Sequence, residues 1–178
     1  RCLHLRGVKI DDDKATKPGR RGFVQSADEL GQLIAEGRME EALDSAYEAQ
    51  RVAPDDIGAQ QRYHTLLGLA GKEERQLQHA TRYLGLLLQK NEGAEALKLY
   101  QAMQARDAAF APEQPGQLLL LARAARQLRE YNQALTLIKG FDKRFPRHVD
   151  IPAVYLFAAP VLCANIKQAA PARHILPA

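Results

Sequence analysis

Side chains that commonly perform chemistry are few in this sequence, and they stand apart from one another. The 178 residues contain five histidines and two cysteines, namely His4, His64, His79, His148, His174, Cys2 and Cys163. None of the histidines pairs with a Cys, Asp or Glu at metal-ligand spacing, and no Cys-x-x-Cys occurs. We therefore expect no bound metal and no cofactor, and we interpret the histidines as surface or helix-capping residues.

Motifs for nucleophilic or phosphate chemistry are also missing from the sequence. The Gly-Lys-Glu at residues 71–73 lacks the Ser or Thr of a phosphate-binding loop, and no Gly-x-Ser-x-Gly occurs. Adjacent carboxylates such as Glu40 and Glu41 are expected to be solvated on a helix surface. Cys163 lies in the most apolar segment, where a buried and unreactive thiol is expected. The sequence thus predicts a protein that is not an enzyme.

The composition is that of an ordinary globular chain. With 46% hydrophobic and 26% charged residues, wholesale disorder is excluded, and the length suits one domain with a buried core. No apolar run approaches the roughly 18–20 residues of a membrane-spanning helix. A buried free cysteine without a disulfide partner favours the cytoplasm, where the chain is free-standing or the soluble domain of a larger or membrane-anchored protein. A periplasmic setting stays open.

Helical periodicity dominates the chain after residue 25. Apolar residues recur at three- and four-residue spacing, and no run of alternating β-branched residues predicts a sheet. The segment 150–164 is apolar on all sides and is expected to be a helix buried between neighbours. Pro171 interrupts the last helix. We predict about nine helices, at residues 26–36, 38–52, 57–70, 72–90, 94–106, 117–129, 131–145, 150–164 and 166–176.

Residues 1–25 predict a flexible basic arm in front of a helical domain at residues 26–178. The arm carries seven Lys and Arg against three Asp, contains Lys-Pro-Gly-Arg-Arg-Gly, and shows no sustained period. It is either an inert tether to another domain or a segment that lies against nucleic acid or an anionic lipid surface.

Charge changes sign along the helical domain. Residues 26–56 hold nine acidic and two basic residues, whereas residues 117–178 hold nine basic and three acidic ones. This gradient is either a chance scatter of solvated charges or a sign that the two ends contact different partners.

One pattern of small residues and turns occurs three times, in residues 37–56, 91–110 and 129–148. The second helix of each predicted pair carries a small residue near its start, namely Ala42, Ala96 and Ala134. A residue without bulk lets two helices approach closely. The pattern resembles the tetratricopeptide repeat (TPR) family. That resemblance implies a right-handed α-α superhelix, a TPR-like solenoid whose concave face binds peptides.

The resemblance also implies a tentative site. On the helix at 117–129, the residues facing the groove would be Leu119, Arg123, Arg126 and Gln127. Arg123 and Arg126 stand three residues apart, so they share a face, and two guanidinium groups can hold a carboxylate or an acidic peptide segment. The alternative is a solvated basic face.

These observations favour a non-catalytic scaffold for protein–protein interaction, as part of a larger protein. It would bind a peptide or partner protein that has an acidic segment. The alternative is a domain that binds nucleic acid or an anionic membrane surface through the arm and the basic C-terminal third, although the neutral body argues against it. A third alternative is self-association through the apolar segment at 151–163.

Overall fold

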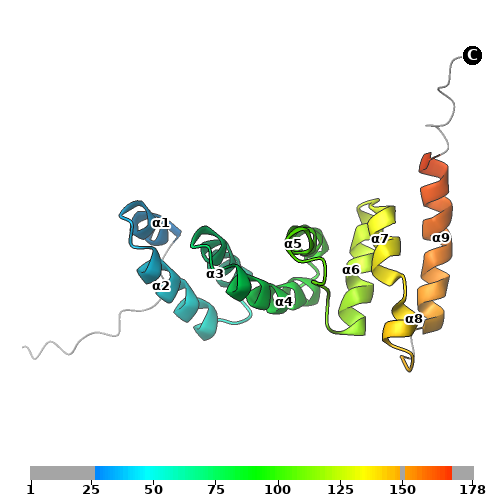
Figure 1. Ribbon diagram of the computed structural model, residues 1–178, viewed down its shortest axis with the longest axis horizontal. Coiled ribbons are helices and arrows are strands. Elements are labelled where there is room, and N and C mark those ends of the chain that lie inside the picture. Colours follow the sequence, from blue (N-terminus) through cyan, green and yellow to red (C-terminus); the bar gives the residue numbers. More distant parts are fainter. Residues whose placement is uncertain (1–26, 149–150, 170–178) are drawn as a thin grey trace, which may run out of the picture.

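The computed structural model describes residues 27–148 and 151–169, and these contain nine helices and no strand (Figure 1). The helices are α1 (Ala27–Ala35), α2 (Met39–Val52), α3 (Ile57–Leu69), α4 (Glu73–Gln89), α5 (Gly93–Arg106), α6 (Pro115–Gln127), α7 (Tyr131–Ile138), α8 (Phe141–Arg144) and α9 (Ile151–Ala169). Helices α1–α7 each pack mainly against their neighbours in sequence, and α9 packs mainly against α7, so the helices form a row from α1 to α9. The predicted all-α fold is confirmed for these residues, and the predicted arm at 1–25 lies outside them.

Four of the turns between successive helices share one structure. Each has a residue in the left-handed region, with φ between 63° and 76°, and these residues are Gly37, Gly71, Asn91 and Arg129. The next backbone N–H donates to the carbonyl five residues earlier, as in the bonds Arg38 to Leu33, Lys72 to Leu67, Glu92 to Leu87 and Glu130 to Ala125. This arrangement satisfies the last carbonyls of one helix and reverses the chain within two residues.

The position five residues after each left-handed residue is buried against the preceding helix. Ala42, Ala96 and Ala134 occupy it in three hairpins and are fully buried. Gln76 occupies it in the α3–α4 hairpin, where a Cβ on Gly68 would lie only 2.7 Å from the Gln76 amide nitrogen. Because the same turn follows both α3 and α4, α4 is the second helix of one hairpin and the first of the next.

The predicted single helix at 131–145 is wrong, because the structure divides it. α7 ends at Ile138, Lys139 is extended, and Gly140 adopts φ 75° before the short α8 begins. The left-handed glycine redirects the chain so that Phe141 enters the core, where it is 1% exposed.

The predicted burial of 150–164 between neighbours is also wrong. α9 is one helix that continues through Pro160 to Ala169, and it takes in the start of the separately predicted segment 166–176. Val154 and Val161 face the core, but Leu156 and Ile166 are 76% and 67% exposed. The expected burial of Cys163 fails for the same reason, since its side chain lies on the exposed face. The remainder of that segment, 170–176, lies outside the described residues.

Buried apolar side chains form two separate clusters. We call the cluster of α1–α3 the N-terminal core, and its members are Leu30, Ala42, Leu43, Ala46, Tyr63, Leu66 and Leu67. The second cluster, the C-terminal core, draws on α4–α9 and includes Leu84, Leu87, Leu121 and Phe141. At the end of α2 and where α3 packs on α4, five polar side chains are buried beside the rings of Tyr63 and Tyr83. We call these the polar seam, and they are Gln50, Gln60, His64, Gln76 and His79.

Candidate binding groove and polar seam

A hollow of about 1000 Å³ lies between α4 and the start of α6. Four glutamines line it, and none of their side chains has a hydrogen bond among the described residues; they are Gln78, Gln89, Gln114 and Gln117. The remaining lining residues are Pro54, Asp55, Thr81, Arg82, Gly85, Leu86, Glu113, Gly116 and Leu120. Each free amide offers a donor and an acceptor, so the hollow presents mixed hydrogen-bonding groups to solvent.

Local sequence explains how these amides come to face one another. Pro115 occupies the first turn of α6, where a missing N–H costs nothing, and Gln114 before it is extended. Gly85 on α4 leaves room for α6, because a Cβ there would lie 2.8 Å from the Gln117 side-chain nitrogen. Gln117 is therefore held close to the α4 backbone.

A second hollow of about 420 Å³ continues along α6. It adjoins the first at Leu120, which lines both. Its lining residues are Leu88, Asn91, Gly93, Ala94, Leu120, Arg123, Ala124, Gln127 and Leu128. The start of α5 approaches α6 closely here, since a Cβ on Gly93 would lie 2.9 Å from the Ala124 Cβ. We call the two hollows together the α4–α6 groove.

The four residues predicted to line a groove lie on two sides of α6. Arg123 and Gln127 line the second hollow and are exposed. The Arg126 guanidinium instead lies 5.4 Å from the ring centroid of Phe157 on α9, a cation–π contact. Leu119 is half-buried against the C-terminal core. The structure thus joins Arg123 with Arg82 in one groove and directs Arg126 toward α9.

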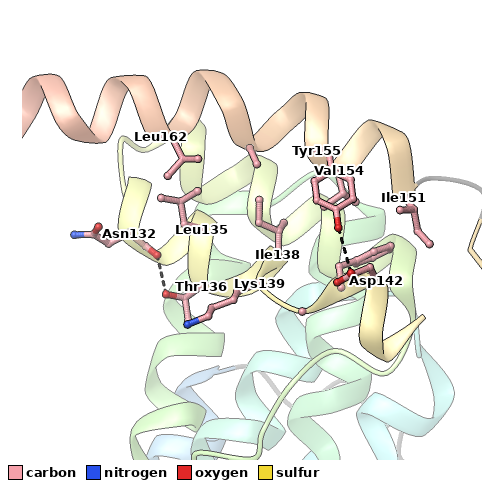
Figure 2. A pocket seen from close by; sticks show the side chains of 13 residues that line it. Asn132, Leu135, Thr136, Ile138, Lys139, Asp142, Ile151, Val154, Tyr155 and Leu162 are labelled. Atoms are coloured by element: carbon pink, nitrogen blue, oxygen red, sulfur yellow. Dashed lines mark hydrogen bonds between the residues drawn. The ribbon is translucent and has the colours of Figure 1, made fainter. Parts of the chain in front are cut away.

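A third hollow, of about 610 Å³, lies between α7, α8 and α9. Figure 2 shows Leu162 of α9 pointing toward Leu135 of α7 across this space. At its rim the Tyr155 hydroxyl donates to an Asp142 carboxylate oxygen at 3.1 Å. The walls are mainly apolar, so this recess offers burial to an apolar group and little hydrogen bonding.

The polar seam contains two histidines, which corrects the expectation that all histidines are surface or capping residues. His64 on α3 and His79 on α4 are each 9% exposed. Their ring centroids lie 5.8 Å apart, and the Tyr63 ring meets His79 edge-on at 4.9 Å. The sequence held one signal for this seam. Gln76 takes the position that alanine fills in the other three hairpins.

Hydrogen bonds fix the proton on His79. The Gln60 side-chain nitrogen donates to the Pro54 carbonyl at 2.9 Å and to the Gln50 amide oxygen at 3.3 Å. The Gln60 oxygen is thus left to accept from His79 Nε2 at 2.7 Å. Neutral His79 therefore carries its proton on Nε2, and its buried Nδ1 has no partner among the described residues.

The opposite tautomer follows for His64. The Gln76 oxygen accepts from the always-protonated Arg106, so the Gln76 nitrogen is the donor that faces His64. It donates to the His64 carbonyl at 3.1 Å and lies 3.4 Å from His64 Nε2. His64 therefore accepts at Nε2 and carries its proton on Nδ1, which has no partner among the described residues.

Both histidines are held neutral. Burial is the main cause that lowers the pKa of His64 from 6.5 to about 4, and the charge of Arg106 adds to it. Burial likewise lowers the pKa of His79 from 6.5 to about 4, with smaller contributions from His64 and Arg82. No carboxylate of the described residues is hydrogen-bonded to either ring.

A scan against protein-family models gives no match, and a search of curated proteins gives no significant match. In the segments that the structure describes, no helix has the length and apolar character needed to cross a membrane. Those segments also hold no group of three or more His, Cys, Asp or Glu placed to bind a metal ion.

Proposed function

We propose that the chain is a TPR-like right-handed solenoid and a non-catalytic scaffold that binds an extended segment of a partner protein in the α4–α6 groove. The observation that carries this proposal is the row of uncommitted glutamine amides on both walls of one groove. Recurring hairpins support the solenoid, because four turns of one structure place a buried residue at the same position in each second helix.

The groove chemistry favours an extended peptide over a small polar molecule. An extended main chain presents an N–H and a C=O at every residue, and a side-chain amide satisfies one of each. Leu120, at the junction of the hollows, is 43% exposed and offers apolar contact to a peptide side chain. Arg82 and Arg123 supply guanidinium groups for carboxylates, so we expect the bound segment to contain at least one Asp or Glu.

The test begins with peptides selected from a random display library against the full chain. Affinity for labelled peptides is then measured by fluorescence anisotropy. Arg123→Ala should weaken binding at least fivefold, because Arg123 lines the groove. Arg126→Ala is the matched control, since it removes the same side chain from the same helix on the side that faces Phe157.

A second matched pair tests the amides. Gln117→Ala should weaken binding about threefold, consistent with the loss of one or two hydrogen bonds. Gln101→Ala removes an exposed glutamine of α5 that lines neither hollow and should leave binding unchanged. Equal effects of groove and control variants would contradict the proposal. Binding of nucleic acid or anionic vesicles that is lost at high salt and unchanged by both groove variants would instead favour a surface for nucleic acid or anionic membranes.

A further inference from the structure

The two cores of the molecule meet largely through polar side chains, beside Ile57 of α3, which packs against the C-terminal core. Two hydrogen-bonded chains make up the seam. Gln50, Gln60 and His79 join α2, α3 and α4, and His64, Gln76 and Arg106 join α3, α4 and α5. The N-terminal and C-terminal cores remain separate clusters on either side of this seam. The attachment of α1–α3 to the rest therefore depends strongly on whether the seam keeps its hydrogen bonds.

We propose that the polar seam is an acid-sensitive joint, in which protonation of His64 and His79 releases α1–α3 from α4–α9. This proposal concerns the folded chain itself and does not rest on peptide binding. It follows from the direction of the seam hydrogen bonds and from the charges around the two rings.

Protonation of His64 places two N–H donors opposite each other, one on the ring and one on the Gln76 side chain. The added proton enters at Nε2, which faces the Gln76 side-chain nitrogen. Gln76 cannot resolve the conflict by turning its amide, because its oxygen accepts from Arg106 and the turned amide would place a nitrogen there. The hydrogen bond between Gln76 and His64 Nε2 is therefore lost when His64 is charged, and the Gln76 bond to the His64 carbonyl remains.

Protonation of His79 places a new N–H in a buried position. The added proton enters at Nδ1, which is buried and has no partner among the described residues. A buried charged group without a partner is strongly unfavourable, so the ring gains stability by reaching water. A separation of α3 from α4 would provide that water.

The groups that face the two rings increase the effect. Arg106 of α5 acts on His64, and Arg82 of α4 acts on His79, both as cations. The two charged imidazoles also repel each other across 5.8 Å between centroids. The phenols of Tyr63 and Tyr83, which flank the rings, stay neutral in acid and supply no compensating charge.

Opening of the joint would also change the α4–α6 groove. The Pro54 carbonyl accepts from Gln60 in the seam, and Pro54 with Asp55 forms one end of the first hollow. Separation of α1–α3 would move this end of the hollow away from α4 and α6. The groove is thereby linked to the seam, a consequence that depends on the proposed function while the joint itself does not.

Distances between spin labels test the joint directly in the full 178-residue chain. Labels on Asp44→Cys and Gln101→Cys, in a background with Cys2→Ser and Cys163→Ser, report on the two units. Labels on Gln101→Cys and Lys143→Cys stay within α4–α9 and are the matched control. Pulsed electron paramagnetic resonance at pH 7 should give one narrow distance for each pair.

At pH 4.5 we expect the Asp44–Gln101 distribution to broaden and lengthen while the control pair stays narrow. The variant His64→Phe with His79→Phe cannot take up these protons and should give the same distribution at both values of pH, and His148→Gln should behave as the wild type. An unchanged wild-type distribution, equal broadening of both pairs, or acid-dependent broadening in the double variant would each overturn the proposal.

A second measurement, on the wild-type chain, tests the proposal even if the double variant does not fold. Histidine NMR signals of the wild type, followed from pH 8 to pH 4, give the protonation midpoints of His64 and His79. We expect both midpoints below pH 5.5 and coincident with the broadening of the Asp44–Gln101 distribution. Midpoints near the ordinary value of about 6.5 without a change in distance would overturn the joint.

Discussion

The N-terminal core holds seven buried apolar residues from α1–α3, whereas the C-terminal core holds 21 from α4–α9. Ion pairs show the opposite distribution, since five of the six within the described residues lie between residues 36 and 72. Exposed ion pairs contribute about 0–1 kcal/mol each, less than a buried leucine. The comparison teaches that the smaller unit depends on its attachment to the larger one, and that this attachment is largely polar.

Matched leucine substitutions should have the largest effect. Leu67 in the N-terminal core and Leu121 in the C-terminal core are both 0% exposed. Each change to Ala should cost about 2–5 kcal/mol, through lost burial and a cavity. Leu67→Ala should release α1–α3 first, so that helical circular dichroism falls in two steps with urea. Leu121→Ala should lower one common transition, and identical single-step shifts in both variants would contradict the separation of the cores.

Acidification should have the next largest effect. The unfolded chain binds protons on His64 and His79 from about pH 6.5 downward, whereas the folded chain takes them up only near the lowered pKa of about 4. Stability is therefore complete above pH 6.5 and falls as the pH falls toward 4, by about 1–3 kcal/mol already at pH 5.5.

Calorimetry between pH 7 and pH 4.5 checks this loss as a lower melting temperature. Arg38 lowers the pKa of both Glu36 and Glu41 through hydrogen bonds, and their contribution is lost mainly below this window, because the unfolded chain protonates glutamate only at about pH 4.3. A melting temperature that is constant over the window would rule out the buried neutral histidines.

A pair of glycine substitutions tests how closely the Gln76 amide of the seam is packed. Gly68→Ala forces the Gln76 amide to move and should cost about 1–2 kcal/mol, the scale of a disrupted buried hydrogen bond. Gly31→Ala in α1 meets nothing within 4 Å and should stabilise the chain by about 0.5–1 kcal/mol through helix propensity. Urea midpoints of the two variants should move in opposite directions. If both urea midpoints move in the same direction, close packing at Gly68 does not hold the Gln76 amide in place.

The hairpin turns should show the smallest effect. Arg129 adopts φ 63°, which favours glycine, so Arg129→Gly should stabilise by about 0.5–1 kcal/mol. Gly37→Ala places a Cβ at φ 76° and should destabilise by about 1 kcal/mol. Thermal melts of both variants check these signs, and an unfavourable Arg129→Gly would mean that the Arg129 side chain contributes more than its backbone costs.

Helices and hairpins were predictable because local residues determine them. Gly37 ends α1, and Gly71 ends α3, since each turn needs a left-handed residue that the sequence supplies. The break between α7 and α8 was not predictable from apolar spacing, because that spacing continues across Gly140. The exposure of the outer face of α9 also escaped prediction, since an apolar sequence does not show which neighbours are present.

The candidate site was predictable only in part. Arg123 and Gln127 were expected in a groove from the resemblance to the repeat family, and both line the second hollow. Arg126 was grouped with them, but a phenylalanine on α9 sets its direction, and such a tertiary contact leaves no mark on local spacing. The buried histidines were missed because no carboxylate or cysteine neighbours them in sequence, whereas their partners are amides on other helices.

Native-state hydrogen exchange of the wild-type chain, measured by NMR at pH 7 in increasing sub-denaturing urea, tests the central claim that two units meet at a polar seam. The account predicts that amides of α1–α3 open together, at a lower free energy than amides of α5–α7. Within each group, the opening free energies of the amides should converge on one dependence on urea, and the two dependences should differ. A single dependence shared by all protected amides, from α1 to α9, would contradict it.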